Sequence, residues 1–375
     1  MRHYLLQSAQ AEKNDIMSET AILNRAGDRR TDQPRAGADD KAMLKAAADL
    51  TRDLNAANPA IYWADLIGSA LLGYGALALA ILATSTLVFA VSVIVAILAL
   101  YRAGSFIHEL THLKPRAVPG FSLAWNRVIG IPLLVPSFMY EGVHNQHHAK
   151  TYYGTANDPE YLPLALMKPW TLPVFIISAV LAPIALLFRF AILAPMSLVI
   201  PALRKLVMER YSGLQINPAF RRPAPTGDFA RQWAWKEAAT SIWSIGLLAA
   251  VWAGIVPLRA FVIFLGVASG VMLLNQVRTL VAHLWENDGE PMSVTAQYLD
   301  SVNVPPPATL PALWAPVGLR YHGLHHLLPG LPYHALGEAH RRLCAALDER
   351  SIYHEASYRG LSPLVGRLIA SSWRA

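Results

Sequence analysis

Histidine is the residue type in this sequence whose spacing points most directly to chemistry. Thirteen histidines occur among the 375 residues, and eight of them fall into three short clusters. The first cluster reads HELTH, and the other two, HNQHH and HGLHH, share the pattern HxxHH. The clustered set consists of His108, His112, His144, His147, His148, His322, His325 and His326.

The spacing within each cluster suits metal binding from a helix. Residues four apart share one helix face, with Cβ atoms about 5–6 Å apart, so both histidines of HELTH can reach one ion. In HxxHH the first histidine shares a face with both later ones, whereas the adjacent pair is splayed by about 100°. Neutral imidazole binds zinc, copper, nickel or iron. Eight histidines exceed the roughly four ligands of a zinc ion, which predicts two metals with four or five nitrogens each.

Membrane helices must position these clusters, because the sequence between them is strongly apolar. Hydrophobic residues make up 54% of the chain and charged residues 15%, against about 25% charged residues in a soluble domain. Residues 66–101 carry no charge. One helix of that length would measure about 54 Å, and the hydrocarbon core of a membrane is roughly 30 Å thick. Two spans with a turn at residues 84–86 are therefore expected, and residues 238–258 and 260–277 repeat the plan.

These spans predict an all-α integral membrane protein with two transmembrane helical hairpins, four spans in total, and a cytoplasmic helical cap that holds the histidines. The positive-inside rule places both termini and residues 103–237 in the cytoplasm, and a bacterial inner (plasma) membrane is expected. Residues 169–203 are apolar but contain Arg189 and several prolines. We expect this segment to form broken helices that lie in, or dip into, the cytoplasmic interface.

The remaining sequence divides into three parts. Residues 1–58 are predicted to be a polar cytoplasmic tail with a short surface helix near 41–54, residues 59–345 the metal-binding membrane domain, and residues 346–375 a cytoplasmic C-terminal tail. The single cysteine, Cys344, excludes an intrachain disulfide. The net charge of +7 reflects membrane topology rather than nucleic-acid binding, because no basic run is interleaved with stacking aromatics.

Histidines outside the clusters have weaker claims. His283 follows the last span at a depth that matches His108, so we predict it to be a ninth ligand rather than an interfacial cap. His334 is a lesser candidate, and His340 is expected on the solvated face of a helix. His3 and His354 are expected on the surface. Asn275 is expected to be buried in the last span, as either a helix-packing hydrogen bonder or a site residue.

HELTH, HNQHH and HGLHH, in this order on a two-hairpin frame, resemble the membrane fatty acid desaturase superfamily over about residues 60–345. The resemblance implies two iron ions (Fe2+/Fe3+) at the cytoplasmic surface, held by the eight clustered histidines and His283. It also implies dioxygen as co-substrate and a lipid acyl chain as substrate. An asparagine that helps to hold iron in stearoyl-CoA desaturases is replaced here by Thr279, so that role is not transferred. No catalytic residue beyond the metal ligands and no organic cofactor is implied.

The resemblance further implies a separate electron donor of the ferredoxin, rubredoxin or cytochrome b5 type, because no fused cytochrome b5-like domain is visible. The leading prediction for the reaction is desaturation of an acyl chain. Hydroxylation or ketone formation on a lipid is the alternative, because the motifs do not encode how substrate carbons are held. Acidic residues near the clusters are candidates for orienting the imidazoles, with simple solvation as the alternative. These are Glu141, Asp158, Glu160, Glu286 and Asp288.

Two other classes of protein fit the histidines less well. HELTH also matches HExxH, the helix motif of zinc proteases, in which Glu109 would be the general base. The later spans contain no acid to complete such a site, and six clustered histidines would have no role. A divalent-metal transporter should place histidines or acids inside its spans, whereas the clustered histidines lie outside them.

Overall fold

Four helical stretches of the protein are long and apolar enough to cross a membrane. They are α4 (Pro59–Leu82), α5 (Thr86–His112), the stretch Thr171–Ser197, and α12 (Leu258–Leu280). The computed structural model describes residues 39–308 and 310–375, and within those residues extended backbone pairs only in isolated bridges. The predicted all-α architecture with four helices of membrane-spanning length is confirmed, but Thr171–Ser197 takes the place of the predicted span at residues 238–258 among the four.

The first hairpin forms where the uncharged run predicted it. Asn58 caps α4 through a hydrogen bond to the backbone of Ala60, and Pro59 occupies the first turn. The chain reverses at residues 83–85, and α5 packs back along α4. Large apolar side chains such as Leu82 (76% exposed) point outward near the tip. An exposed apolar surface of this kind requires a lipid environment.

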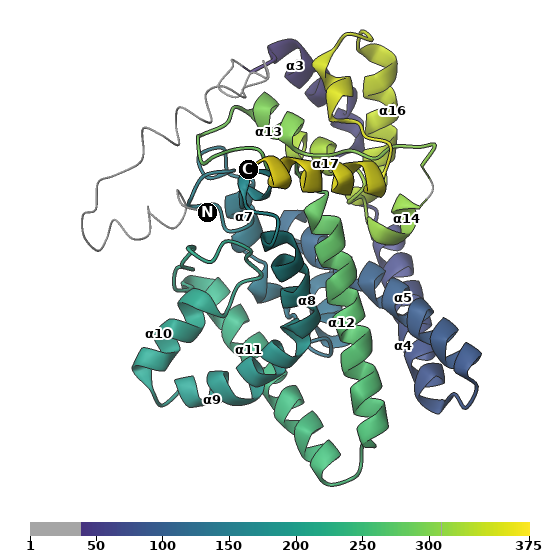
Figure 1. Ribbon diagram of the computed structural model, residues 1–375, viewed down its shortest axis with the longest axis vertical. Helices are drawn as coiled ribbons and strands as arrows, with labels where there is room; N and C mark the ends of the chain where they lie inside the picture. The colour runs from purple at the N-terminus through teal and green to yellow at the C-terminus, as the bar shows by residue number, and fades with distance from the viewer. Residues whose placement is uncertain (1–38, 309) are drawn as a thin grey trace.

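The second hairpin contains a longer first helix than expected. Figure 1 shows α11 (Gly227–Trp252) and α12 joined by a short turn at the end farthest from the cap, and the two helices diverge from that turn. The first half of α11 carries Asp228, Arg231, Lys236 and Glu237, and only its second half is apolar. Trp252 at its end is 93% exposed. This charged first half explains why α11 is absent from the four strongly apolar stretches.

Residues 171–197 differ from the prediction of broken helices. They form α8 (Thr171–Phe188), a π-helical turn (Arg189–Leu193) and α9 (Ala194–Ser197) without interruption, and Pro183 lies inside α8. Arg189 does not break the helix because its guanidinium forms an ion pair with Glu237 of α11 and donates to the carbonyl of Tyr211. The helical run ends only after Ser197.

The chain then returns to the side of the molecule that holds the histidines. After α10 (Pro201–Arg210), the backbone N–H of Leu214 donates to the carbonyl of Met139. The N–H of Asn217 donates to the carbonyl of Pro159. Both acceptors lie close in sequence to HNQHH, so the segment leaves and re-enters on one side, as the placement of the histidines required.

Short helices form a cap above the two hairpins (Figure 1). The predicted surface helix near 41–54 is confirmed as α3 (Lys41–Leu50) and a 3-10 turn (Arg52–Leu54), but it is packed on the cap, with Met43 and Ala47 buried. Residues after 345 are not a separate tail either, because Tyr353, Leu364 and Leu368 are buried. The rest of the predicted N-terminal tail, residues 1–38, lies outside the described residues. The remaining cap helices are α6 (Phe121–Trp125), α7 (Val143–His147), α13 (Val294–Asp300), α14 (Pro311–Trp314), α15 (His322–Leu327), α16 (Leu336–Ala346) and α17 (Leu361–Arg374).

Candidate metal centre

All nine histidines that were predicted as metal ligands come together in two adjacent groups. Within each group the potential ligand atoms lie within 4.8 Å of one another. The five-histidine group comprises His108, His112, His144, His148 and His325. The four-histidine group comprises His147, His283, His322 and His326.

Each HxxHH cluster divides between the two groups. α5 ends at His112 and supplies both histidines of HELTH from its last turns. In HNQHH and HGLHH the adjacent pairs His147–His148 and His325–His326 point to different groups. This is the splay of about 100° between consecutive helical residues, which allows one short helix to serve two ions. His283 comes from the turn that follows α12.

The positions of the ring nitrogens fit metal ions. Nε2 of His148 lies 3.0 Å from Nε2 of His144 and 3.1 Å from Nε2 of His325. In the other group, Nε2 of His322 lies 3.0 Å from that of His283 and 3.2 Å from that of His326. Two nitrogens bound about 2.1 Å from one ion at right angles would be about 3.0 Å apart. Both ring nitrogens of His108 are buried and have no hydrogen-bond partner among the described residues, so a cation at the common point of the group accounts for the arrangement.

Carboxylates contact two of the rings through Nδ1, the nitrogen that faces away from the centre of the group. Nδ1 of His147 lies 2.9 Å from Asp158, and Nδ1 of His144 lies 3.0 Å from Glu160 and 2.9 Å from the hydroxyl of Tyr140. We assign the proton to Nδ1 in both rings, which leaves the Nε2 lone pair free for a metal. Asp158 and Glu160 were both predicted for this role.

A third carboxylate, Asp300, was missed by the sequence analysis. Tyr153 donates to Asp300 at 2.8 Å, and Nδ1 of His283 lies 2.8 Å from the same tyrosine oxygen. Tyr161 also donates to Asp300, at 3.2 Å. Asp300 ends α13, seventeen residues from the nearest metal-group histidine in sequence, His283, so no local motif links them. The only sequence signal for this contact was Tyr153, which follows His148 by five residues and links His283 to Asp300.

Burial keeps most of these histidines neutral, as metal ligation requires. Burial, and then neighbouring histidines, lowers the pKa of His148, His325 and His326 well below 6.5. His147 is the exception: burial lowers its pKa, but the carboxylates of Asp158, Glu160 and Asp300 together raise it. Burial also raises the pKa of Glu160 to about 7 and that of Asp300 to about 6.

The other candidate histidines lie outside both groups. Nε2 of His334 accepts a hydrogen bond from the backbone of Asn58. The prediction for His340 is wrong, because its side chain is buried and its Nδ1 lies 2.8 Å from the hydroxyl of Tyr353. The ring of His354 packs edge-on against that of Tyr353, and His3 lies outside the described residues.

Three acids and one asparagine that were candidates for a role at the site make other contacts or are exposed. Glu141 pairs with Lys236 and Glu286 with Arg367, so neither orients a histidine. Asp288 is exposed. Asn275 was predicted to be buried, but it lies on the exposed face of α12.

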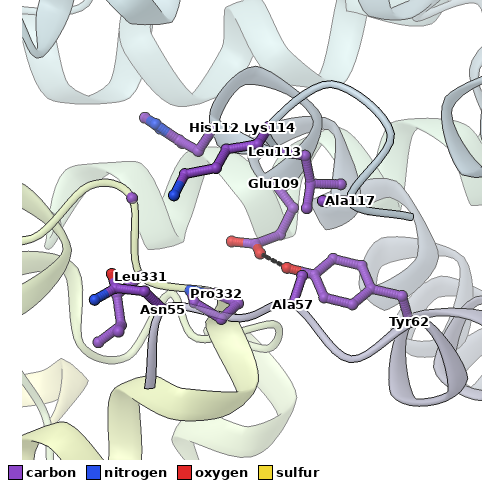
Figure 2. Close-up of a pocket in the computed structure, with 11 residues that line it drawn as sticks. Asn55, Ala57, Tyr62, Glu109, His112, Leu113, Lys114, Ala117, Leu331 and Pro332 are labelled. Carbon is purple, nitrogen blue, oxygen red and sulfur yellow. Dashed lines mark hydrogen bonds between the residues drawn. The ribbon is translucent and has the colours of Figure 1, made fainter. Parts of the chain in front are cut away.

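The carboxylate of Glu109, in the HELTH motif, accepts hydrogen bonds from two other segments of the protein. The hydroxyl of Tyr62 donates to its carboxylate at 2.5 Å, and the backbone N–H of Tyr333 donates to it at 3.1 Å. Figure 2 shows the Tyr62 contact at the wall of a small pocket that also reaches His112 and the exposed Lys114. A carboxylate occupied in this way is poorly placed to serve as the general base of a zinc protease.

Helical hairpins beneath a buried polyhistidine centre define a class of membrane protein with a paired metal site. A family model described as fatty acid desaturase matches residues 83–358. The ceramide hydroxylase of Caulobacter vibrioides (strain NA1000 / CB15N) is 47% identical over 331 residues, which cover 88% of this chain and 94% of the relative. No solved structure matches the chain at a significant level. The chain belongs to the fatty acid desaturase family, as the histidine clusters predicted.

Family membership fixes the general class of activity. The protein is a membrane enzyme of the oxidoreductase kind that acts on a lipid. Between the two reactions left open by the sequence, the relative favours the hydroxylase alternative over the leading prediction of a desaturase.

Proposed function

We propose that this protein is a di-iron, dioxygen-dependent hydroxylase of a ceramide-class lipid. The observation that carries the proposal is the 47% identity to a ceramide hydroxylase along 88% of the chain. We further propose that it acts at the cytoplasmic face of a bacterial inner membrane. The two histidine groups support the proposal because they offer five and four nitrogens to two neighbouring ions.

The proposed reaction inserts one oxygen atom into a carbon–hydrogen bond. One atom of dioxygen enters the substrate as a hydroxyl group, and the other leaves as water after taking up two electrons and two protons. We propose that a separate ferredoxin, rubredoxin or cytochrome b5-type protein supplies the electrons. Two irons, when bound, would supply the dioxygen activation that this chemistry needs.

The protein's own contribution is to keep most of the histidines neutral, to orient three of the rings and to exclude water. Asp158, Glu160 and the Tyr153–Asp300 pair fix three of the rings. His147, His283, His322 and His326 are all less than a tenth exposed, so water has little access to this side of the centre.

Desaturation of an acyl chain remains the second candidate, and the family model's description favours it. Product analysis separates the two reactions. The chain would be expressed with a matched reductase in cells that contain ceramide, and total lipids would be analysed by mass spectrometry. We expect ceramide to gain one oxygen atom, and His322→Ala to abolish the product. Loss of two hydrogens without oxygen gain would instead establish a desaturase.

Metal analysis tests the cofactor independently. Purified protein from iron-rich medium should contain about two irons per chain, as two groups of four or five nitrogens predict. One zinc ion with negligible iron in an active preparation would contradict the di-iron proposal.

A further inference from the structure

Arg278 is a buried cation to which the described residues offer no ion-pair partner. It lies in the last turn of α12, five residues before His283, and its side chain is 9% exposed. Among the described residues it forms no ion pair, and its buried Nε has no hydrogen-bond partner. The comparable buried guanidinium of Arg189 is paired with Glu237. A buried charge without a partner is costly, so a partner beyond the described residues is expected for Arg278.

The charge of Arg278 acts on the metal centre. Burial first, then neighbouring histidines and Arg278, lower the pKa of His283 and His322. At Glu160, where burial raises the pKa to about 7, Arg278 is one of the groups that act in the opposite direction. His283, His322 and Glu160 come from three separate segments of the chain. Because Arg278 acts on all three, it lies close to the point where these segments meet.

Arg278 also lies on the side of the centre that a membrane lipid would approach. It is two residues from the end of a membrane-spanning helix. Tyr101, which lies within electrostatic reach of Arg278, donates to the carbonyl of Trp314 in α14. α14 contacts both α5 and α12, and the neighbouring Leu310 and Leu313 are at least half exposed. Exposed apolar side chains beside α12 are therefore available to contact the chains of a lipid.

We propose that Arg278 donates hydrogen bonds to oxygen atoms of the polar head of the lipid substrate and so determines which carbon reaches the metal centre. The inference rests on the proposed function, in which a ceramide offers amide and hydroxyl oxygens as acceptors. A guanidinium carries five N–H donors in a rigid fork and suits such a group of acceptors. Arg278 is in this role a residue that sets substrate specificity and position.

The test measures lipid binding rather than turnover. Wild-type protein, Arg278→Met and Arg278→Lys would be placed in nanodiscs and titrated with a short-chain ceramide and two analogues. One analogue keeps both chains and the amide but lacks the hydroxyl groups, and the other lacks the amide carbonyl. Arg259→Met is the matched control, because Arg259 is an arginine at the opposite end of α12 that donates to the carbonyl of Ala83.

We expect wild-type protein and Arg259→Met to prefer ceramide to at least one analogue by about 10- to 100-fold, the range for hydrogen bonds to a charged group. Arg278→Met should bind all three lipids within about twofold of one another, with Arg278→Lys intermediate and iron content unchanged. An undiminished preference in Arg278→Met would overturn the proposal. Loss of iron from both Arg278→Met and Arg278→Gln would also overturn it, by assigning Arg278 to support of the metal centre.

The same measurements separate this inference from the proposed function. Wild-type protein that prefers ceramide through Arg278 but yields no hydroxylated product would contradict the hydroxylase and leave the role of Arg278 intact. Wild-type protein that shows no preference among the three lipids would contradict the role of Arg278 even if ceramide is hydroxylated.

Discussion

Nδ1 of His147 lies 2.9 Å from the carboxylate of Asp158, and both side chains are buried. Asp158 also accepts hydrogen bonds from the backbone N–H groups of Gly154 and Glu160. Gly154 has a φ of +69°, and a Cβ there would lie 2.6 Å from the side chain of Asn287, so the loop requires glycine at this point. One carboxylate thus holds both a candidate ligand and the loop behind it.

Asp158→Asn should weaken metal binding without removing a ligand. Replacing a residue that orients a metal-binding histidine typically lowers affinity or activity by about 10- to 100-fold. Iron retention against a graded series of chelators would measure the loss. Asp288→Asn is the control, because Asp288 was predicted for the same role but is exposed. Equal iron retention in the two variants would contradict the orienting role.

His283→Ala should remove a nitrogen from the four-histidine group. Elemental analysis should find that iron falls from about two per chain to about one or less, since three nitrogens remain for that ion. His334→Ala is the matched control, because His334 lies outside both groups and accepts a hydrogen bond from Asn58. Full iron content and activity in His283→Ala would show that the eight clustered histidines suffice.

His340→Ala should affect stability rather than metal content. The substitution leaves the buried hydroxyl of Tyr353 without its partner, which costs about 1–3 kcal/mol. We expect a lower Tm with unchanged iron per folded chain, and Tyr353→Phe should lower the Tm by a similar or smaller amount. A loss of iron in His340→Ala would mean that this buried pair supports the metal centre.

Acid should destabilise the metal-free protein. Burial lowers the pKa of histidines such as His322, His325 and His326 well below 6.5, so below that pH the unfolded state binds more protons and the free energy of unfolding falls. Glu160 and Asp300 act in the opposite sense, because their raised pKa values, about 7 and about 6, favour the folded state as they protonate.

The histidines with a lowered pKa outnumber the two acids, so the Tm of metal-free protein should fall between about pH 7 and pH 5. Metal-loaded protein should release its ions over the same range, because protons compete with metals for imidazole. A series of thermal unfolding curves at constant ionic strength measures the trend. A Tm that rises towards pH 5 would mean that the acids dominate.

Reporter fusions test the path of the chain through the membrane. Fusions after residues 160, 215 and 375 should report the same side, because Leu214 and Asn217 bond to the backbone beside HNQHH. An insertion near Ser85, in the turn of the first hairpin, should report the opposite side. Opposite results at 160 and 215 would mean that residues 171–197 cross the membrane completely.

The two histidine groups were largely predictable because most of their members occur in local motifs. The helical spacing in HELTH and the two HxxHH clusters predicts which histidines share a helix face. Only His283 had to be inferred from its expected depth in the membrane. The orienting residues were less visible. Asp158 and Glu160 were foreseen because they follow HNQHH closely, whereas Asp300 reaches His283 through Tyr153 from a distant segment.

The predictions for the remaining residues failed where tertiary contacts override local character. His340 precedes two arginines, Arg341 and Arg342, which suggested a solvated helix face, but Tyr353 from a later segment covers it. Arg189 and the prolines suggested a broken segment, but Glu237 from α11 neutralises the arginine within a continuous helix. In each case the deciding partner lies at least thirteen residues away in the sequence.

The division of each HxxHH cluster between the two groups makes the loading of the two ions interdependent. An ion held by either group would restrain α7 and α15, and these same helices carry histidines of the other group. The conformational entropy lost in restraining the two helices would be lost only once, so the second ion should bind more tightly than the first. A metal titration of empty protein should therefore pass from no ions to two with little of the singly loaded form, and the enzyme population should consist of complete and empty centres.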